Sequence, residues 1–209
     1  MRRFPVDLRC VEPPPPPLPE ADAHADDQQY EQSTRPCLTN SSYGSPVTVS
    51  FKAVSLNVLT LGKANKQAGL RVRGRARFIQ QQLAQCNASV IGVQEARTSG
   101  PHTRTGEHYH VISSGCEPRA VLGVELWCAK VIQRSKGKPI AVASEDLQLI
   151  YHDSRRLLVA LRNEHIALDF FVAHAPCETQ KDEGWWGTTR TILARYANPA
   201  ILGTMIDAN

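Results

Sequence analysis

The chain has 209 residues, of which 42% are hydrophobic and 21% charged, and its formal net charge at pH 7 is +4. These values are ordinary for a soluble globular protein, and no apolar run approaches the length of a membrane span. The basic N-terminus lacks the apolar stretch of a secretory signal, and the six cysteines show no CxxC pair or metal-site spacing. We therefore expect an intracellular protein, nuclear or cytoplasmic, that is not secreted, keeps reduced thiols and has no membrane partner.

Residues 1–46 differ in composition from the rest of the chain. A proline run at 13–17 is followed by a polar, acidic stretch with few aliphatic residues. Such a segment buries too little apolar surface to offset its ordering entropy, which predicts a disordered tail. Residues 1–48 carry four Arg against seven acidic residues, a net −3, which leaves +7 on residues 49–209. A basic folded part is compatible with a polyanionic partner such as nucleic acid.

The apolar residues become periodic after the tail. Residues 47–61 predict a long strand that ends near Asn57. A helix is expected over 74–86, with Asn87 as its C-terminal stop. Four residues would share its buried face: Ala76, Ile79, Leu83 and Cys86. Three further strands are predicted in the following part of the chain, at 89–95, 107–114 and 120–132.

The next apolar runs indicate an antiparallel meander, because short connections such as Asp153-Ser154 separate them. Its strands are predicted at 147–152, 155–163 and 166–174. A helix is expected over 179–196, ended by Pro199, and a last strand over 200–206. One side of that helix would hold five residues: Trp185, Thr189, Ile192, Leu193 and Tyr196. This order of elements suggests a two-sheet sandwich with helices on the outside.

Four apolar runs end in polar residues. These residues are Asn57, Gln94 with Glu95, His174, and Asp207 with Asn209. Each of them alone is explained by a turn, a cap or a solvated side chain. A sheet, however, brings strand ends to a common edge, where ligand sites tend to form. We therefore expect these residues to cluster on one edge of the fold.

The residue types at these strand ends fit one chemistry. Carboxylate and amide oxygens are ligands that suit Mg²⁺ or Mn²⁺. The sequence has no zinc-type His/Cys spacing, no P-loop and no GxSxG elbow. One histidine beside hard oxygen ligands suits the metal-assisted attack of water on a phosphoester.

The ordered set of motifs resembles the endonuclease/exonuclease/phosphatase superfamily, which has the DNase I-like fold. The resemblance is carried by SLNVLT, VIGVQEAR, FFVAHAP and MIDAN, in that order, and covers roughly residues 50–209. It implies an α/β (α+β) fold, a DNase I-like two-sheet β-sandwich flanked by helices. Residues 47–209 would then be a partial domain of this superfamily, following the tail at 1–46.

The resemblance also implies a divalent metal, Mg²⁺ or Mn²⁺, and roles for the matching residues. Glu95 would be the principal metal ligand, with Asn57 beside it near the metal and the phosphate. Gln94 would support Glu95 rather than react.

The remaining motif residues would act on the phosphate and the water. His174 would hydrogen-bond the scissile phosphate, Asp207 would orient or deprotonate the attacking water, and Asn209 would hold a phosphate oxygen. The family usually has a glycine where this chain has Ile206, and such a residue would restrict the backbone and crowd the phosphate. The family's final Asp-His pair is also absent from the sequence. We therefore expect a domain that is incomplete at its C-terminus and impaired in activity.

Within the superfamily, the stretches VQEARTSG, ELWCAK and WWGTTR look most like retroelement endonuclease domains of the LINE type. A basic cluster could approach a nucleic-acid backbone, or could be a solvated helix start: Arg71, Arg73, Arg75 and Arg77. The sequence thus predicts a divalent-metal-dependent phosphodiester hydrolase, with a DNA endonuclease favoured and DNA preferred over RNA as partner. An inert fragment or binding module, and a phosphatase or deadenylase of the same fold, stay open as alternatives, as does the oligomeric state.

Overall fold

The computed structural model describes residues 49–59, 61, 74–116, 122–134, 136–176, 179–197 and 202–207. These residues belong to one unit that spans residues 44–209. The tail predicted for residues 1–46 lies outside the described residues, as do Arg71, Arg73, Pro199 and Asn209.

The first sheet has five strands in the order β1-β2-β5-β4-β3. They are β1 (Ala53–Asn57), β2 (Val90–Gln94), β3 (His102–Thr105), β4 (Tyr109–Ser113) and β5 (Glu125–Ala129). The strands β1 and β2 are parallel, because helix α1 (Arg75–Gln85) lies between them in sequence, whereas the other pairs are antiparallel. Parallel pairing brings the carboxyl ends of β1 and β2 to the same edge of the sheet.

The second sheet, which also combines one parallel pair with antiparallel pairs, has four strands in the order β11-β10-β9-β8. They are β8 (Leu147–His152), β9 (Arg156–Arg162), β10 (Ala167–His174) and β11 (Leu202–Asp207). The pairs β8–β9 and β9–β10 are antiparallel, which confirms the predicted meander. Helix α2 (Thr179–Tyr196) lies between β10 and β11 in sequence, and these two strands are parallel.

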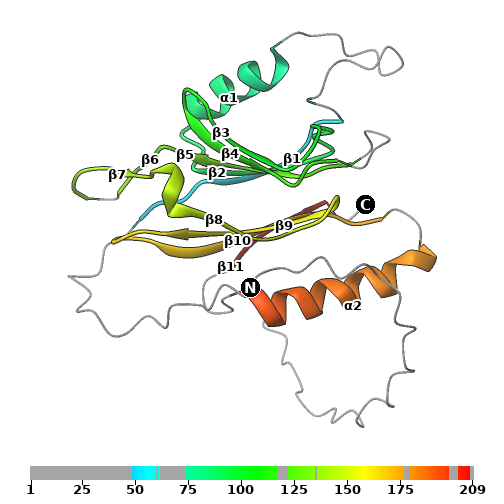
Figure 1. Ribbon diagram of the computed structural model, residues 1–209. Coiled ribbons are helices and arrows are strands. Elements are labelled where there is room, and N and C mark those ends of the chain that lie inside the picture. The colour runs from blue at the N-terminus through cyan, green and yellow to red at the C-terminus, as the bar shows by residue number, and fades with distance from the viewer. Residues whose placement is uncertain are drawn as a thin grey trace, which may run out of the picture. The chain divides into compact units, whose positions relative to one another are not determined.

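The two sheets face each other, with α1 on the outer side of the first and α2 on the outer side of the second (Figure 1). The central core lies between them and includes Leu126, Val159, Val172 and Met205. The outer faces pack on the helices: Ile91 and Val93 with Ile79 and Leu83 of α1, and Phe171 and Ala173 with Trp185 of α2. The predicted two-sheet sandwich with flanking helices is confirmed.

Several local predictions need correction. The first strand starts at Ala53 rather than near residue 47, because Val49 and Ser50 pair with Arg134 and Gln133 instead of with β2. Cys86 is exposed rather than buried, since it caps α1 beyond the last turn, and Gln80 is the buried residue of that helix. The strand predicted over 120–132 is divided into β5 and β6 (Val131–Ile132).

Three short elements were not predicted at all. They are strand β3, strand β7 (Ile140–Ala141) and the 3₁₀ turn η2 (Ser144–Asp146). The sequence of β3, HTRT, is polar and mostly exposed, as an edge strand permits, so it gives no apolar signal.

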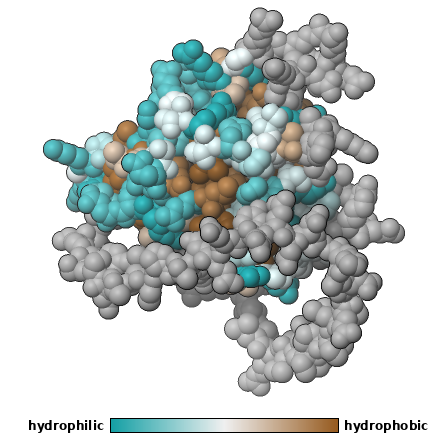
Figure 2. Space-filling view, in the orientation of Figure 1, coloured by the Kyte–Doolittle hydropathy of each residue, from teal (hydrophilic) through white to brown (hydrophobic). Residues whose placement is uncertain are grey.

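The described surface is mostly hydrophilic in the view of Figure 2, with an apolar area near the middle. Exposed large apolar residues do occur in the described part: Leu59, Phe78, Val131, Leu149, Ile150 and Trp186. Neither described helix is long and apolar enough to cross a membrane.

Candidate active site

The carboxyl ends of four strands meet at one edge of the sandwich. Asn57 ends β1 in register with Gln94 of β2, and His174 ends β10 in register with Asp207 of β11. Both strand pairs are parallel, so each sheet presents two polar ends at the same edge. Of the six strand-end residues expected there, the structure brings four together, namely Asn57, Glu95, His174 and Asp207. Gln94 lies beneath them, and Asn209 lies outside the described residues.

Asn57 joins the two sheets. Its Nδ2 donates to Glu95 Oε1 at 3.0 Å and to Asp207 Oδ2 at 2.7 Å, while its Oδ1 accepts from the backbone N–H of Leu59 at 3.1 Å. A single amide therefore holds carboxylates from opposite sheets within hydrogen-bond distance of one nitrogen. Hydrogen bonds to charged acceptors are among the stronger ones, which favours a fixed geometry at this edge.

Gln94 lies beneath this group and is 1% exposed. Its Nε2 donates to Ser55 Oγ at 3.0 Å and to the backbone oxygen of Met205 at 3.2 Å, so it too crosses between the sheets. Two residues earlier, Gly92 leaves room for this close approach, since a Cβ there would lie 2.7 Å from Met205 Cβ. Gln94 thus connects the two sheets without reaching the site itself, and its expected support of Glu95 stays a prediction.

Glu95 and Arg97 both adopt left-handed backbone conformations, each with φ 54°. Non-glycine residues pay about 1–3 kcal/mol for such conformations, so surrounding contacts must hold the segment. Arg97 donates to Glu95 Oε2 at 2.8 Å, and its backbone N–H donates to Leu122 O at 2.9 Å. Ala96 N–H donates to Gly123 O at 2.9 Å. Backbone strain at a set of polar side chains is a common mark of functional sites.

The protonation states follow from burial and neighbouring charge. Burial raises the pKa of Glu95, but hydrogen bonds from Asn57 and Arg97, and the nearby His174 and Arg97 charges, bring the pKa below its ordinary value. Burial is the largest influence on the pKa of His174 and lowers it, the carboxylates of Glu95 and Asp207 raise it, and Arg155 and Arg97 lower it, so that the pKa lies below its ordinary value. At neutral pH the site therefore holds an ionised Glu95 beside a neutral imidazole, whose Nε2 is 3.8 Å from Glu95 Oε1.

A buried carboxylate next to this edge was not predicted. Glu125 begins β5 opposite Val93 and is 0% exposed. It accepts from Trp127 Nε1 at 2.6 Å and from Thr98 Oγ1 at 2.9 Å, with Arg104 at 3.9 Å. Thr98 follows the strained segment, so Glu125 anchors the chain that carries Glu95. The available sequence signal was the one carboxylate inside the apolar run AVLGVELWCAKVI.

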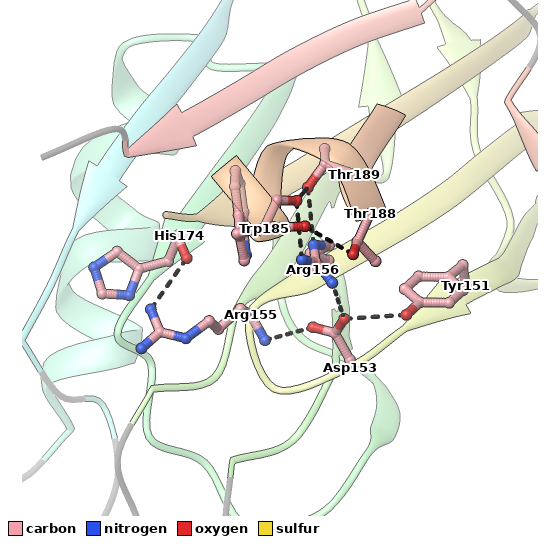
Figure 3. A network of polar contacts seen from close by, with 9 residues as sticks. Tyr151, Asp153, Arg155, Arg156, His174, Trp185, Thr188 and Thr189 are labelled. Atoms are coloured by element: carbon pink, nitrogen blue, oxygen red, sulfur yellow. Dashed lines mark hydrogen bonds and ion pairs between the residues drawn. The ribbon is translucent and has the colours of Figure 1, made fainter. Parts of the chain in front are cut away.

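A second network ties the start of β9, beside His174, to α2 (Figure 3). Arg156 is buried and donates to Asp153 Oδ2 at 2.8 Å, to Thr189 Oγ1 at 3.0 Å and to the backbone oxygen of Trp185 at 3.3 Å. Its guanidinium carbon also lies 4.8 Å from the centroid of the Trp185 ring. The turn before β9, which touches His174, is thereby tied to the helix outside the sheet.

Comparison with known proteins supports the fold. No protein-family model and no curated protein matches the chain. Among solved structures, the endonuclease domain of TRAS1, a telomere-specific non-LTR retrotransposon, is similar with a TM-score of 0.50 and 12% identity; 77% of this chain and 59% of that domain are covered. The chain has the DNase I-like fold. It spans about 59% of the TRAS1 domain's length. The Xenopus laevis APE2 catalytic domain also matches, with a TM-score of 0.34, 16% identity, and 66% and 49% coverage of the two chains.

The DNase I-like fold implies a divalent metal, and the strand-end residues partly fit one. Glu95 and Asp207 offer hard carboxylate oxygens that share the Asn57 amide nitrogen. Asn57 itself turns its nitrogen toward them and its oxygen toward Leu59, so in this orientation it is a donor rather than a metal ligand. The described residues contain no ready cluster of three or more His, Cys, Asp or Glu. Glu95 and Asp207 are thus the two carboxylates at this edge that could hold an ion.

The structure also shows where Ile206 and two arginines of the predicted basic cluster lie in the DNase I-like sandwich. Ile206 packs with the apolar cluster beneath α2, because alternation along β11 directs neighbouring side chains to opposite faces. The expectation that it crowds the phosphate stays a prediction. Arg77 lies on α1 and pairs with Glu107 at 3.4 Å between exposed side chains, and Arg75 begins the same helix. Both arginines are therefore on the outer helix rather than among the strand-end residues.

Proposed function

We propose that the chain is a divalent-metal-dependent phosphodiester hydrolase that acts on nucleic acid, with a DNA endonuclease of retroelement type as the favoured activity. The observation that carries the proposal is the Asn57 amide, which joins Glu95 of one sheet to Asp207 of the other beside His174. The similarity to the TRAS1 endonuclease domain supports the choice of nuclease. The net +7 on residues 49–209 supports a polyanionic substrate.

The residues would divide the chemistry between them. Glu95, ionised at neutral pH, would hold a Mg²⁺ or Mn²⁺ ion. When bound, that ion would neutralise charge on a phosphate oxygen. Asp207 would orient the attacking water or accept its proton, and Asn57 would keep both carboxylates in place. His174, neutral at this pH, would donate a hydrogen bond to the scissile phosphate. The role expected for Asn209, on a phosphate oxygen, stays a prediction.

Two alternative functions can be distinguished from the proposed endonuclease by experiment. A phosphatase or deadenylase of the same fold would use the same carboxylates on a different phosphoester. A binding module would hold nucleic acid without cleaving it. The expectation that the missing Asp-His pair impairs activity also stays a prediction, and the assay below would measure the residual rate.

The test is plasmid nicking in Mg²⁺ and in Mn²⁺, with chelator as the metal-free control. Glu95→Gln keeps the size of the side chain and removes its charge, so we expect at least a hundred-fold loss of rate, the scale of about 2.7 kcal/mol or more seen for single transition-state contacts. Glu107→Gln makes the same change at an exposed carboxylate and should have no effect. Nicking that survives Glu95→Gln unchanged would overturn the metal assignment. DNA binding with no cleavage in either metal would favour the binding module.

A further inference from the structure

Arg155 lies in the turn between β8 and β9, directly beside His174. The backbone N–H of His174 donates to Arg155 O at 2.9 Å, and the Arg155 guanidinium donates to His174 O at 3.4 Å. Figure 3 shows the Arg155 guanidinium extending along His174, toward the end of the strand that carries the imidazole. The side chain is half-buried, so its position is restrained and still open to solvent.

Among the described residues, the Arg155 guanidinium has no carboxylate partner. The nearest acid on its own turn, Asp153, is already used: Oδ1 accepts from the Arg155 backbone N–H at 2.7 Å, and Oδ2 accepts from Arg156 and from Tyr151 at 2.8 and 3.1 Å. Glu95 of the candidate active site is paired with Arg97. Arg156 and Arg97 each pair with a carboxylate, whereas Arg155 has no such pair in the described part of the chain. The half-buried positive charge of Arg155 can therefore be neutralised by an anion from outside the chain.

The turn that carries Arg155 is tied to the segment that carries Glu95. Ser154 O accepts from Gly123 N–H at 2.9 Å, and Gly123 O accepts from Ala96 N–H at 2.9 Å. Two hydrogen bonds thus connect the turn to the residue that follows Glu95. The Arg156 network holds the other side of the same turn against α2. Arg155 is consequently placed relative to the candidate active site by backbone hydrogen bonds.

The geometry points to Arg155 as a phosphate-binding residue at the edge of the candidate active site, where it contacts a backbone phosphate of the bound nucleic acid. This inference rests on the proposed function, since it needs a nucleic-acid strand to pass His174. A guanidinium presents several N–H donors in one plane and matches the oxygens of a phosphate. One N–H of the Arg155 guanidinium is used by the His174 carbonyl, and the remaining N–H groups would bind the phosphate. DNA and RNA offer the same phosphate chemistry, so both are included in the test.

The experiment measures binding without cleavage. Anisotropy of labelled DNA and RNA duplexes of one sequence is recorded in chelator at salt concentrations between about 50 and 200 mM, the range over which a phosphate contact is diagnostic. Arg155→Ala and Arg155→Gln both remove the charge, and the glutamine keeps a donor for the His174 carbonyl. Arg155→Lys keeps the charge, and Arg190→Ala removes an exposed arginine of α2 as the matched control. Urea midpoints confirm that each variant is folded.

We expect Arg155→Ala and Arg155→Gln to weaken binding and to lower the slope of log affinity against log salt by about 0.9, the value for one lost contact to duplex DNA. Their deficit relative to the unmodified chain should therefore shrink about three-fold across this salt range. Arg155→Lys should keep the slope, and Arg190→Ala should behave as the unmodified chain. Equal slopes in all variants would overturn the inference while leaving the proposed hydrolase intact. A normal Arg155 effect without any nicking would retain the inference and reject hydrolysis, and failure to bind either duplex would reject both.

Discussion

The substitution Gly92→Ala, which adds one methyl group, should test whether the close approach of the two sheets positions the candidate active site. It lies in the middle of β2, and a Cβ added there would lie 2.7 Å from Met205 Cβ, 3.0 Å from Met205 Sδ and 3.2 Å from Val172 Cγ1. Ordinary contacts between carbon atoms are about 3.5–4.0 Å. The nearest atom is Met205 Cβ, which is bonded directly to the backbone and cannot move unless strand β11 moves with it. Gly92→Ala should therefore force β2 and β11 apart by about 1 Å.

That separation would reach the candidate active site two residues further along both strands. The Asn57 to Asp207 hydrogen bond, now 2.7 Å, would lengthen beyond the roughly 3.2 Å limit of a good hydrogen bond. Overpacking of a core by one or two methyl groups costs about 1–3 kcal/mol. We expect a loss of this size in the free energy of unfolding, together with a fall in nicking rate larger than the stability change explains.

The assay is urea unfolding followed by tryptophan fluorescence, with nicking measured well below the unfolding midpoint. Gly187→Ala is the matched control, because Gly187 is an exposed helical glycine with no atom within 4 Å of an added Cβ. Alanine should stabilise that helix by about 0.5–1 kcal/mol. If Gly92→Ala were as stable as the unmodified chain and equally active, the sheets would not meet as closely as the structure has them, and the reasoning would fail.

Two further outcomes are expected from the buried polar groups. Burial, with a contribution from Cys86, raises the pKa of Tyr109 to about 12 from 10.0. The folded protein therefore holds the phenol proton more tightly than the unfolded chain, so titration of Tyr109 should leave stability unchanged below pH 10 and lower it toward pH 12. Urea midpoints across this range should show that loss, and Tyr109→Phe should lack it. An identical pH profile in both proteins would contradict the assignment. Replacing Glu125 by Leu leaves the Trp127 Nε1–H buried without this acceptor, at about 1–3 kcal/mol, whereas Glu125→Gln keeps an acceptor and should cost less. Equal urea midpoints for the two Glu125 variants would count against the network.

The strand ends could be predicted from the sequence because the signal is local. An apolar run that stops at Asn57 or at His174 marks both a strand and the place where it leaves the core. Parallel pairing then decides which ends meet, and the order of strands and helices in the chain already indicates that pairing. For this reason the contact between Asn57 and Asp207, 150 residues apart, could be anticipated.

The supporting residues could not be predicted, because their roles depend on register and on turns. Glu125 matters only because β5 runs antiparallel to β2 and places it opposite Val93. Arg155 matters only because the turn before β9 folds against the last residue of β10. Neither register nor turn geometry is encoded in the apolar pattern of one strand. A charged residue beside an apolar run is equally consistent with a solvated surface position.

The alternation along β2 explains why a buried strand ends on a carboxylate. Ile91 and Val93 pack toward α1, whereas Val90, Gly92 and Gln94 belong to the face between the sheets. A continued strand would direct residue 95 toward α1, away from the other sheet.

The left-handed turn at Glu95, with φ 54°, breaks that alternation and brings the carboxylate to the Asn57 amide. The apolar part of β2 therefore holds the sheets together, Gly92 and Gln94 set how closely they approach, and the strained residue that follows presents its charge at their common edge.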